Sequence, residues 1–181
     1  MRDIEYAIEG FLTVRRDSLR VPLRGALTIH AGPASDRFTG ELVLDQASVG
    51  RTVAGASLLR ADVQIEAGSP VTGQVDDEGR MLVTVTVDAV LTTVRAAGFT
   101  LIGGGSCRTA AHAVVPLRSQ PGFDLERGGR VTGRYNRPPF TGCGQLTPLV
   151  NLLMAGYGNT VVIDLTPHAA LPGCPAVSPA R

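Results

Sequence analysis

Apolar and polar residues alternate through most segments before residue 140, a period-two pattern that predicts β-strands. The clearest example is 58–67, where four apolar residues alternate with Arg60, Asp62, Gln64 and Glu66, so that one face is apolar and the other charged. Similar patterns predict strands at 4–14, 19–30, 80–95, 108–117, 130–136 and 160–166, and one more through Phe38, Leu42 and Leu44.

The segment 80–95 is the longest of these predicted strands. One face carries an unbroken apolar set, made of Met81, Val83, Val85, Val87, Ala89 and Leu91. This length exceeds the usual strand of about 5–6 residues. Long strands of this kind are typical of a strongly coiled sheet or a barrel.

A single short helix is predicted, with Thr147 as its N-cap and Pro148 at its first position. Such a helix covers little of a large sheet, so the sheet must cover its own apolar face. The sequence therefore predicts a mainly β, antiparallel and strongly coiled sheet that forms a barrel, a half-barrel or a sandwich, with one short C-terminal helix. We expect one domain at 1–167, followed by a Pro/Ala-rich tail at 168–181.

The inward positions are mostly small. Aromatic residues make up 4% of the chain and Trp is absent. Small inward side chains can pack into a flattened solid core, or they can leave an apolar cavity of the kind that holds a lipid. Both alternatives stay open here. The residues expected to line such a cavity are Val63, Ile65, Val83, Val85, Val87 and Leu91.

The charge balance excludes some partners. The 17 basic residues are all Arg and face 16 acidic ones, for a net charge of +1, so neither nucleic acid nor an anionic membrane is an expected partner. No apolar run reaches the length of a transmembrane segment. Arg130 and Arg134 share one face of the strand 130–136, where they could contact a headgroup or a partner's carboxylates, or simply face solvent. Tyr135 points the opposite way.

No motif supports an enzyme. The segment 103–108 departs from both the nucleophile elbow and the dinucleotide loop because Arg108 occupies the position that needs Gly, and we expect a flexible loop there. Ser106, His112 and an aspartate do not form a recognisable triad pattern. Alternation predicts that Asp88 and Asp164 are exposed. We expect no catalytic residues, no cofactor and no metal, since the three cysteines lack zinc-ligand spacing.

Cys107 and Cys143 each lie in a Gly-flanked segment, and they form either a disulfide or two buried thiols. A disulfide would imply export. Cys174 belongs to the tail and is expected to be unpaired or to pair outside the domain. The first residues, 1–5, lack the apolar core of a signal peptide, so we expect either a protein that stays inside the cell or a mature or trimmed form of an exported one.

From residue 107 onward the chain carries the ordered motifs Cys-Arg-Thr (107–109), Pro-Pro-Phe-Thr-Gly-Cys-Gly (138–144), Leu-Thr-Pro-Leu (146–149) and Gly-Tyr-Gly-Asn-Thr (156–160). This order resembles a family of exported actinobacterial β-rich proteins of uncharacterised function. The resemblance implies a signal peptide upstream and a bond between Cys107 and Cys143, but no activity and no catalytic residues. The missing signal peptide and the additional Cys174 depart from the family pattern.

Two functions fit these predictions. The first is a non-enzymatic secreted or cell-envelope protein that binds an apolar ligand, such as a lipid, inside the β structure. The alternative is a structural or interaction module of the envelope with a filled core, which presents either the face with Arg130 and Arg134 or a loop to a protein partner.

Overall fold

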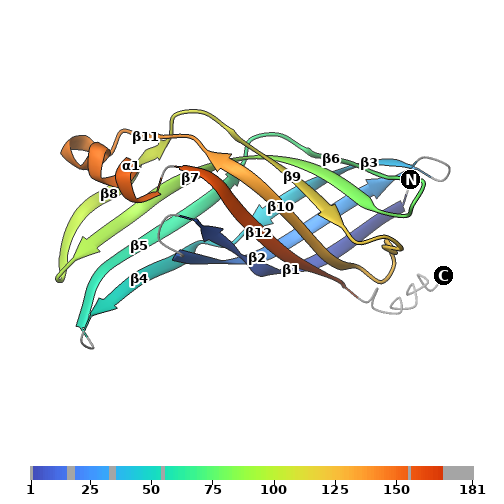
Figure 1. Ribbon diagram of the computed structural model, residues 1–181, viewed down its shortest axis with the longest axis horizontal. Coiled ribbons are helices and arrows are strands. Elements are labelled where there is room, and N and C mark those ends of the chain that lie inside the picture. The colour runs from blue at the N-terminus through green and yellow to red at the C-terminus, as the bar shows by residue number, and fades with distance from the viewer. Residues whose placement is uncertain (1, 16–18, 33–35, 54–55, 155, 169–181) are drawn as a thin grey trace, which may run out of the picture.

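The computed structural model describes residues 2–15, 19–32, 36–53, 56–154 and 156–168. Strands make up 73% of the structure and form a closed, eight-stranded antiparallel barrel with additional strands and one short helix (Figure 1). The predicted fold class is thus confirmed, and the sheet closes completely rather than forming a half-barrel or a sandwich. Closure leaves the barrel itself without an unpaired edge.

Eight strands form the barrel wall. They are β1 (Arg2–Val14), β2 (Leu19–Ala31), β3 (Arg37–Leu44), β6 (Val71–Val75), β7 (Met81–Ala96), β9 (Ala113–Ser119), β10 (Gly129–Arg137) and β12 (Gly156–Pro167). Their order around the wall is β7-β6-β3-β2-β1-β12-β10-β9, and the pairing of β9 with β7 over 82–87 closes the ring.

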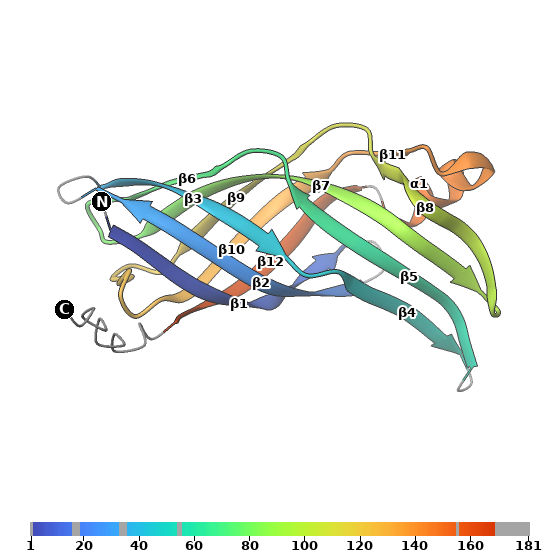
Figure 2. The ribbon, with the colours of Figure 1, turned by 180° about the vertical axis from the view of Figure 1, so that it is seen from behind.

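Beyond residue 87, β7 leaves the barrel wall and becomes the centre of an extension. There it pairs with β5 (Ala56–Ala67) on one side and β8 (Phe99–Thr109) on the other. β4 (Ala47–Val53) adds to β5, and β11 (Phe140–Thr141) adds to β8. These hairpins project past the barrel at the end far from the start of β1 (Figure 2). We call this the flared end, and the opposite one the closed end.

The helix lies at the flared end, close to β8 and β11 (Figure 1). A short 3₁₀ turn, η1 (Gly144–Leu146), leads into α1 (Thr147–Met154), which confirms the predicted helix. Thr147 is not its N-cap, because this residue has helical dihedrals (φ −51°, ψ −46°) and its hydroxyl donates to the Gly144 carbonyl. Of the tail predicted at 168–181, only His168 falls within the described residues, and its backbone N–H donates to the Glu5 carbonyl (2.8 Å).

Several strand boundaries differ from the predictions. The strand predicted at 108–117 is two strands, β8 and β9, which follow one another along the same edge of β7 with a turn at 110–112. The prediction of a flexible loop at 103–108 is wrong as well, since β8 covers that whole segment, including Gly103, Gly104 and Gly105. These glycines belong to β8, where Gly104 and Gly105 take φ values of 84° and 72° and the β7–β8 register shifts, as in a β-bulge. β4 and β6 were not predicted.

Side chains at the closed end fill the barrel interior. Tyr6, Ile29, Val71 and Met81 are all 0% exposed there. The loop between β9 and β10 folds over this end and packs Phe123 and Leu125 against the core, and the Tyr6 hydroxyl donates a hydrogen bond to the Leu125 carbonyl. This end of the barrel is therefore sealed by packed side chains and by a loop fixed to β1.

Candidate ligand-binding cavity

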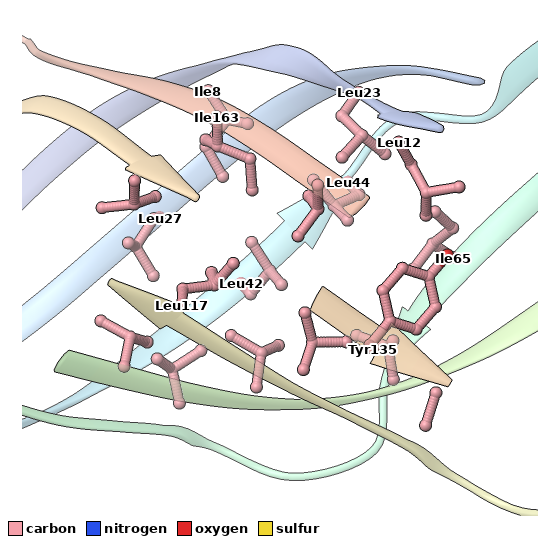
Figure 3. Close-up of a pocket in the computed structure, with 18 of the residues that line it drawn as sticks. Ile8, Leu12, Leu23, Leu27, Leu42, Leu44, Ile65, Leu117, Tyr135 and Ile163 are labelled. Atoms are coloured by element: carbon pink, nitrogen blue, oxygen red, sulfur yellow. The ribbon is translucent and has the colours of Figure 1, made fainter. Parts of the chain in front are cut away.

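The barrel interior contains a cavity of about 80 Å³. All eight barrel strands contribute to its lining, together with Ile65 of β5 and Thr109 of β8 (Figure 3). Among the described residues that line it, the polar side chains are those of Thr109, Tyr135 and Arg137, and the others are aliphatic. The interior is thus an apolar space with a few polar groups.

The residues that line the cavity extend along much of the barrel interior. Its lining includes every second residue of β7 from Met81 to Ala89. At the usual rise per residue, this stretch of strand is about 26 Å long. Figure 3 places Tyr135, Leu12 and Ile65 on one side of the labelled lining group, with Leu27 and Leu117 away from them. The lining is thus extended, while the free space between its side chains is small.

The structure places the six predicted cavity residues in two groups. Ile65, Val83, Val85 and Val87 line the cavity. Val63 and Leu91 are buried, at 3% and 1% exposure, but they are not part of its lining. These two residues face each other across the β5–β7 pairing, where β7 enters the extension, so they pack together beyond the cavity.

Arg137 and Tyr135 supply the polar groups of β10. Arg137 is 8% exposed, and its Nη2 donates to the Tyr135 hydroxyl (2.9 Å) while its Nη1 donates to the Met154 carbonyl at the end of α1 (3.4 Å). Burial raises the pKa of Tyr135, and the Arg137 charge opposes that rise. Tyr135 and Arg137 are two residues apart on β10, so strand alternation places both side chains on the inward face.

The burial of Arg137 is unusual because no carboxylate pairs with it within the described ranges. Burying an ionised group costs about several kcal/mol even after local relaxation, and an opposite charge normally offsets part of this cost. Sequence reasoning missed this residue, because it considered only Arg130 and Arg134 of this strand. The position of Arg137 along β10 could have identified it as an inward residue. It has the same parity as Val131 and Tyr135, whereas Arg130 and Arg134 have the opposite parity.

Arg130 and Arg134 share the outer face of β10, as the alternation predicts. Arg130 donates two hydrogen bonds to Asp164 of β12 (2.7 and 2.9 Å). This guanidinium holds the pKa of Asp164 below its usual range. Arg134 is exposed and borders a shallow outer groove that Arg118 of β9 also lines. The two predicted contact residues therefore differ, because Arg130 already has a carboxylate partner.

The expected exposure of Asp88 is wrong, whereas Asp164 is 47% exposed as expected. The Asp88 side chain is 14% exposed because it lies where the turn between β8 and β9 folds against β7. His112 Nδ1 lies 2.9 Å from its Oδ1, and the Thr109 hydroxyl donates to the same oxygen (3.3 Å). Ser106 instead donates to the Gly142 carbonyl (3.0 Å). These contacts tie the turn to β7 and do not bring Ser106 and His112 into a catalytic arrangement.

Cys107 and Cys143 form a disulfide, with their Cα atoms 4.3 Å apart. The bond joins β8 to the segment between β11 and η1, and so fixes the base of α1 to the extension. This confirms the pairing that the resemblance implied. Cys174 lies outside the described residues.

Within the described ranges, no helix is long and apolar enough to cross a membrane. The same residues hold no group of three or more His, Cys, Asp or Glu side chains placed to bind a metal ion. Comparison of the chain with protein-family models, with curated proteins and with solved structures finds no match.

Proposed function

We propose that this protein is a non-enzymatic binder of an apolar small molecule, such as a cell-envelope lipid, held inside the barrel. The observation that carries the proposal is the aliphatic cavity that all eight barrel strands line. Ligand sites are concave and mostly apolar, with few polar groups to fix orientation. The cavity matches this description, since polar side chains are a small minority of its described lining.

The size of the cavity narrows the ligand class. Its volume of about 80 Å³ exceeds the space that one water needs, roughly 10–15 Å³, and is about half that of an engineered apolar cavity that stays dry and binds benzene. A small free space along an extended, mostly aliphatic lining favours an alkyl chain over a compact ring system. Uptake of a full chain would require leucine side chains such as Leu12, Leu27 and Leu44 to change rotamer.

Export is the second element of this proposal. A buried disulfide, with Cys107 and Cys143 at 0% and 5% exposure, is typical of proteins that fold in an oxidising compartment. The resemblance to exported actinobacterial proteins points the same way. The cell envelope or the exterior is therefore the proposed location, where an apolar ligand needs a carrier or a receptor.

A structural or interaction module with a filled core is the second candidate. The modest volume of the cavity favours it, as does the outer groove bordered by Arg118 and Arg134. Arg130 contributes less to such a surface than expected, because Asp164 already neutralises it. Under this candidate, changing Arg130 and Arg134 to Ser would abolish binding to a protein partner, and no small molecule would enter the barrel.

The test is uptake of 1-dodecanol, followed by native mass spectrometry and by titration calorimetry. We expect one equivalent to bind to the wild-type chain. Ala113→Phe, which fills the cavity from β9, should weaken binding at least tenfold, because Ala113 lines the cavity at 5% exposure. Val114→Phe is the matched control, because Val114 is the next residue on the same strand, is 56% exposed and faces outward.

Two results would contradict the proposal. One is the absence of uptake by the folded wild-type protein of both dodecanol and dodecanoic acid. The other is a folded Ala113→Phe variant that binds dodecanol as tightly as the wild type and Val114→Phe do.

A further inference from the structure

The cavity contains a cation and a hydroxyl group with unused donors. A guanidinium has five N–H groups. Two of those on Arg137 reach the Tyr135 hydroxyl and the Met154 carbonyl, and within the described residues the other three have no acceptor. The Tyr135 hydroxyl accepts from Arg137, and its own proton likewise has no acceptor in that part of the chain. Both side chains therefore have donors left for a third group.

The third group must carry a negative charge to neutralise the buried guanidinium of Arg137. Arg137 is buried beside aliphatic walls and forms no ion pair with the described residues. A buried charge is normally paired, because desolvation without a counter-charge is unfavourable. Carboxylate and phosphate oxygens are the acceptors that a guanidinium binds best, through two parallel N–H bonds.

We infer that Arg137 and Tyr135 bind the anionic headgroup, a carboxylate or a phosphate, of a single-chain amphiphile whose alkyl chain occupies the barrel cavity. This inference rests on the proposed function and names its ligand class. Arg137 would donate to one or two headgroup oxygens, and Tyr135 would donate its proton to another. The chain would then run from the flared end toward the interior near Leu27 and Leu117.

Arg137 also has a structural contact, because its Nη1 reaches the carbonyl of Met154, the last residue of α1. A cation at this position interacts favourably with the helix C-terminus. That role uses one N–H group and would alter the stability of α1 when lost. It would not make the barrel distinguish a charged ligand from a neutral one of equal chain length, so this preference is the informative readout.

The experiment compares three ligands with the same twelve-carbon chain on the wild-type protein, namely dodecanoate, dodecyl phosphate and 1-dodecanol. Calorimetry at neutral pH and low salt gives each affinity. We expect at least one of the two anions to bind ten times or more as tightly as the alcohol. The tighter of the two identifies whether the headgroup is a carboxylate or a phosphate.

Two variants assign the preference to its residues. Arg137→Gln removes the charge while keeping an amide donor, and it should reduce the anion-to-alcohol affinity ratio to within about threefold of one. Tyr135→Phe should lower the same ratio less. Arg134→Gln is the matched control, because it makes the same charge change on the same strand but on the exposed outer face, and it should leave the ratio unchanged.

The outcomes separate the two proposals. Equal binding of anions and alcohol by the wild type would overturn the headgroup inference and leave the apolar-ligand function in place, and this comparison needs no variant to fold. An anion preference that persists in a folded Arg137→Gln variant would also overturn it. Failure of all three ligands to bind would overturn the proposed function itself.

Discussion

Two buried tyrosines, one toward each end of the barrel, show how differently the two ends of the interior are built. Tyr6 of β1 and Tyr135 of β10 pair with Pro167 and Asn159 of the same strand, β12. These positions are eight residues apart, which corresponds to about 26 Å of strand. The Tyr6 hydroxyl donates to the Leu125 carbonyl, whereas the Tyr135 hydroxyl accepts from Arg137.

The two partners give the two ends different roles. Tyr6 is 0% exposed, does not line the cavity, and fixes the loop that seals the closed end. Tyr135 lines the cavity and shares it with the Arg137 guanidinium, which no carboxylate among the described residues neutralises. The barrel is therefore polarised along its length, with a sealed apolar end and a positively charged end. Such a gradient would orient an amphiphile, because the alkyl chain and the charged group prefer opposite ends.

The largest predicted effect is on the wall between the two ends. Val85 of β7 lines the cavity at 6% exposure. Val85→Asp places an unpaired charge in an aliphatic interior, and we expect it to abolish folding, because the penalty of several kcal/mol is comparable to the whole stability of a domain, about 5–15 kcal/mol. Thermal melting followed by circular dichroism is the measurement.

Thr84→Asp is the control for Val85→Asp, because Thr84 is the next residue on β7 and is exposed on the outer face. We expect its stability to change by about 0.5 kcal/mol or less. A Val85→Asp variant that melts like Thr84→Asp would show that the interior admits water and charge along its length, and the contrast between the two ends would then lose its basis.

Reducing the disulfide should act on the flared end. The bond closes a loop between residues 36 positions apart, and the chain-entropy treatment gives a stabilisation of about 3–4 kcal/mol. Because the bond joins β8 to the segment before α1, hydrogen exchange after reduction should accelerate first in β8, β11 and α1, and least in β1 and β2. Uniform acceleration across the barrel would mean that the two ends unfold as one unit.

Alkylation under denaturing conditions is the check on the starting material for that experiment. Without reductant, one thiol per chain should react, that of Cys174, and after reduction all three cysteines should react. Three labelled thiols before reduction would contradict the Cys107–Cys143 bond.

Tyr6→Phe tests the closed end. The variant keeps the buried ring and loses the hydrogen bond to Leu125, so we expect a loss of about 1 kcal/mol at neutral pH, with faster exchange in the loop between β9 and β10. Tyr157→Phe is the control, because that side chain is 82% exposed. A loss no larger than that of the control would show that packing alone seals this end.

The Tyr6→Phe variant should also change how stability depends on pH in the alkaline range. Burial, reinforced by the nearby negative charge of Asp124, raises the pKa of Tyr6 to about 12 from a usual value of 10.0. The folded state thus retains the proton longer than the unfolded state, so this stabilisation is complete below pH 10 and is lost as the pH rises toward 12. In denaturant unfolding across that range, the free energy of unfolding should fall by about 2–3 kcal/mol less in Tyr6→Phe than in the wild type.

The fold was largely predictable because period-two alternation reports which side of a strand is buried. The pattern at β7 placed Val83, Val85 and Val87 correctly. It could not show where β7 exchanges its neighbours, since β9 and β8 pair with successive parts of one edge. That exchange moves Leu91 out of the cavity lining and into the packed base of the extension.

The polar end of the site was not predicted, for a different reason. Parity alone puts Arg137 on the same inward face as Tyr135. A charged residue is normally assigned to the surface, and that prior outweighed the parity. The error at Asp88 has another cause: alternation places it on the outer face, but the turn at 110–112, which had been predicted as strand, covers it there.

The smallest expected effect on stability is that of a substitution at Arg130, the outer counterpart of Arg137 on the same strand. Its bidentate contact with Asp164 is exposed, with side-chain exposures of 63% and 47%, so Arg130→Gln should lower stability only slightly at neutral pH. Arg130 lowers the pKa of Asp164, so the pair stabilises the fold above the unfolded-state pKa of aspartate and this contribution disappears as acid protonates the folded carboxylate. Denaturant unfolding at neutral and acidic pH should therefore show a small difference between wild type and variant that vanishes in acid, while Arg134→Gln shows none at either pH. A loss equal in both variants, or one that persists in acid, would assign the effect to strand packing instead of the ion pair.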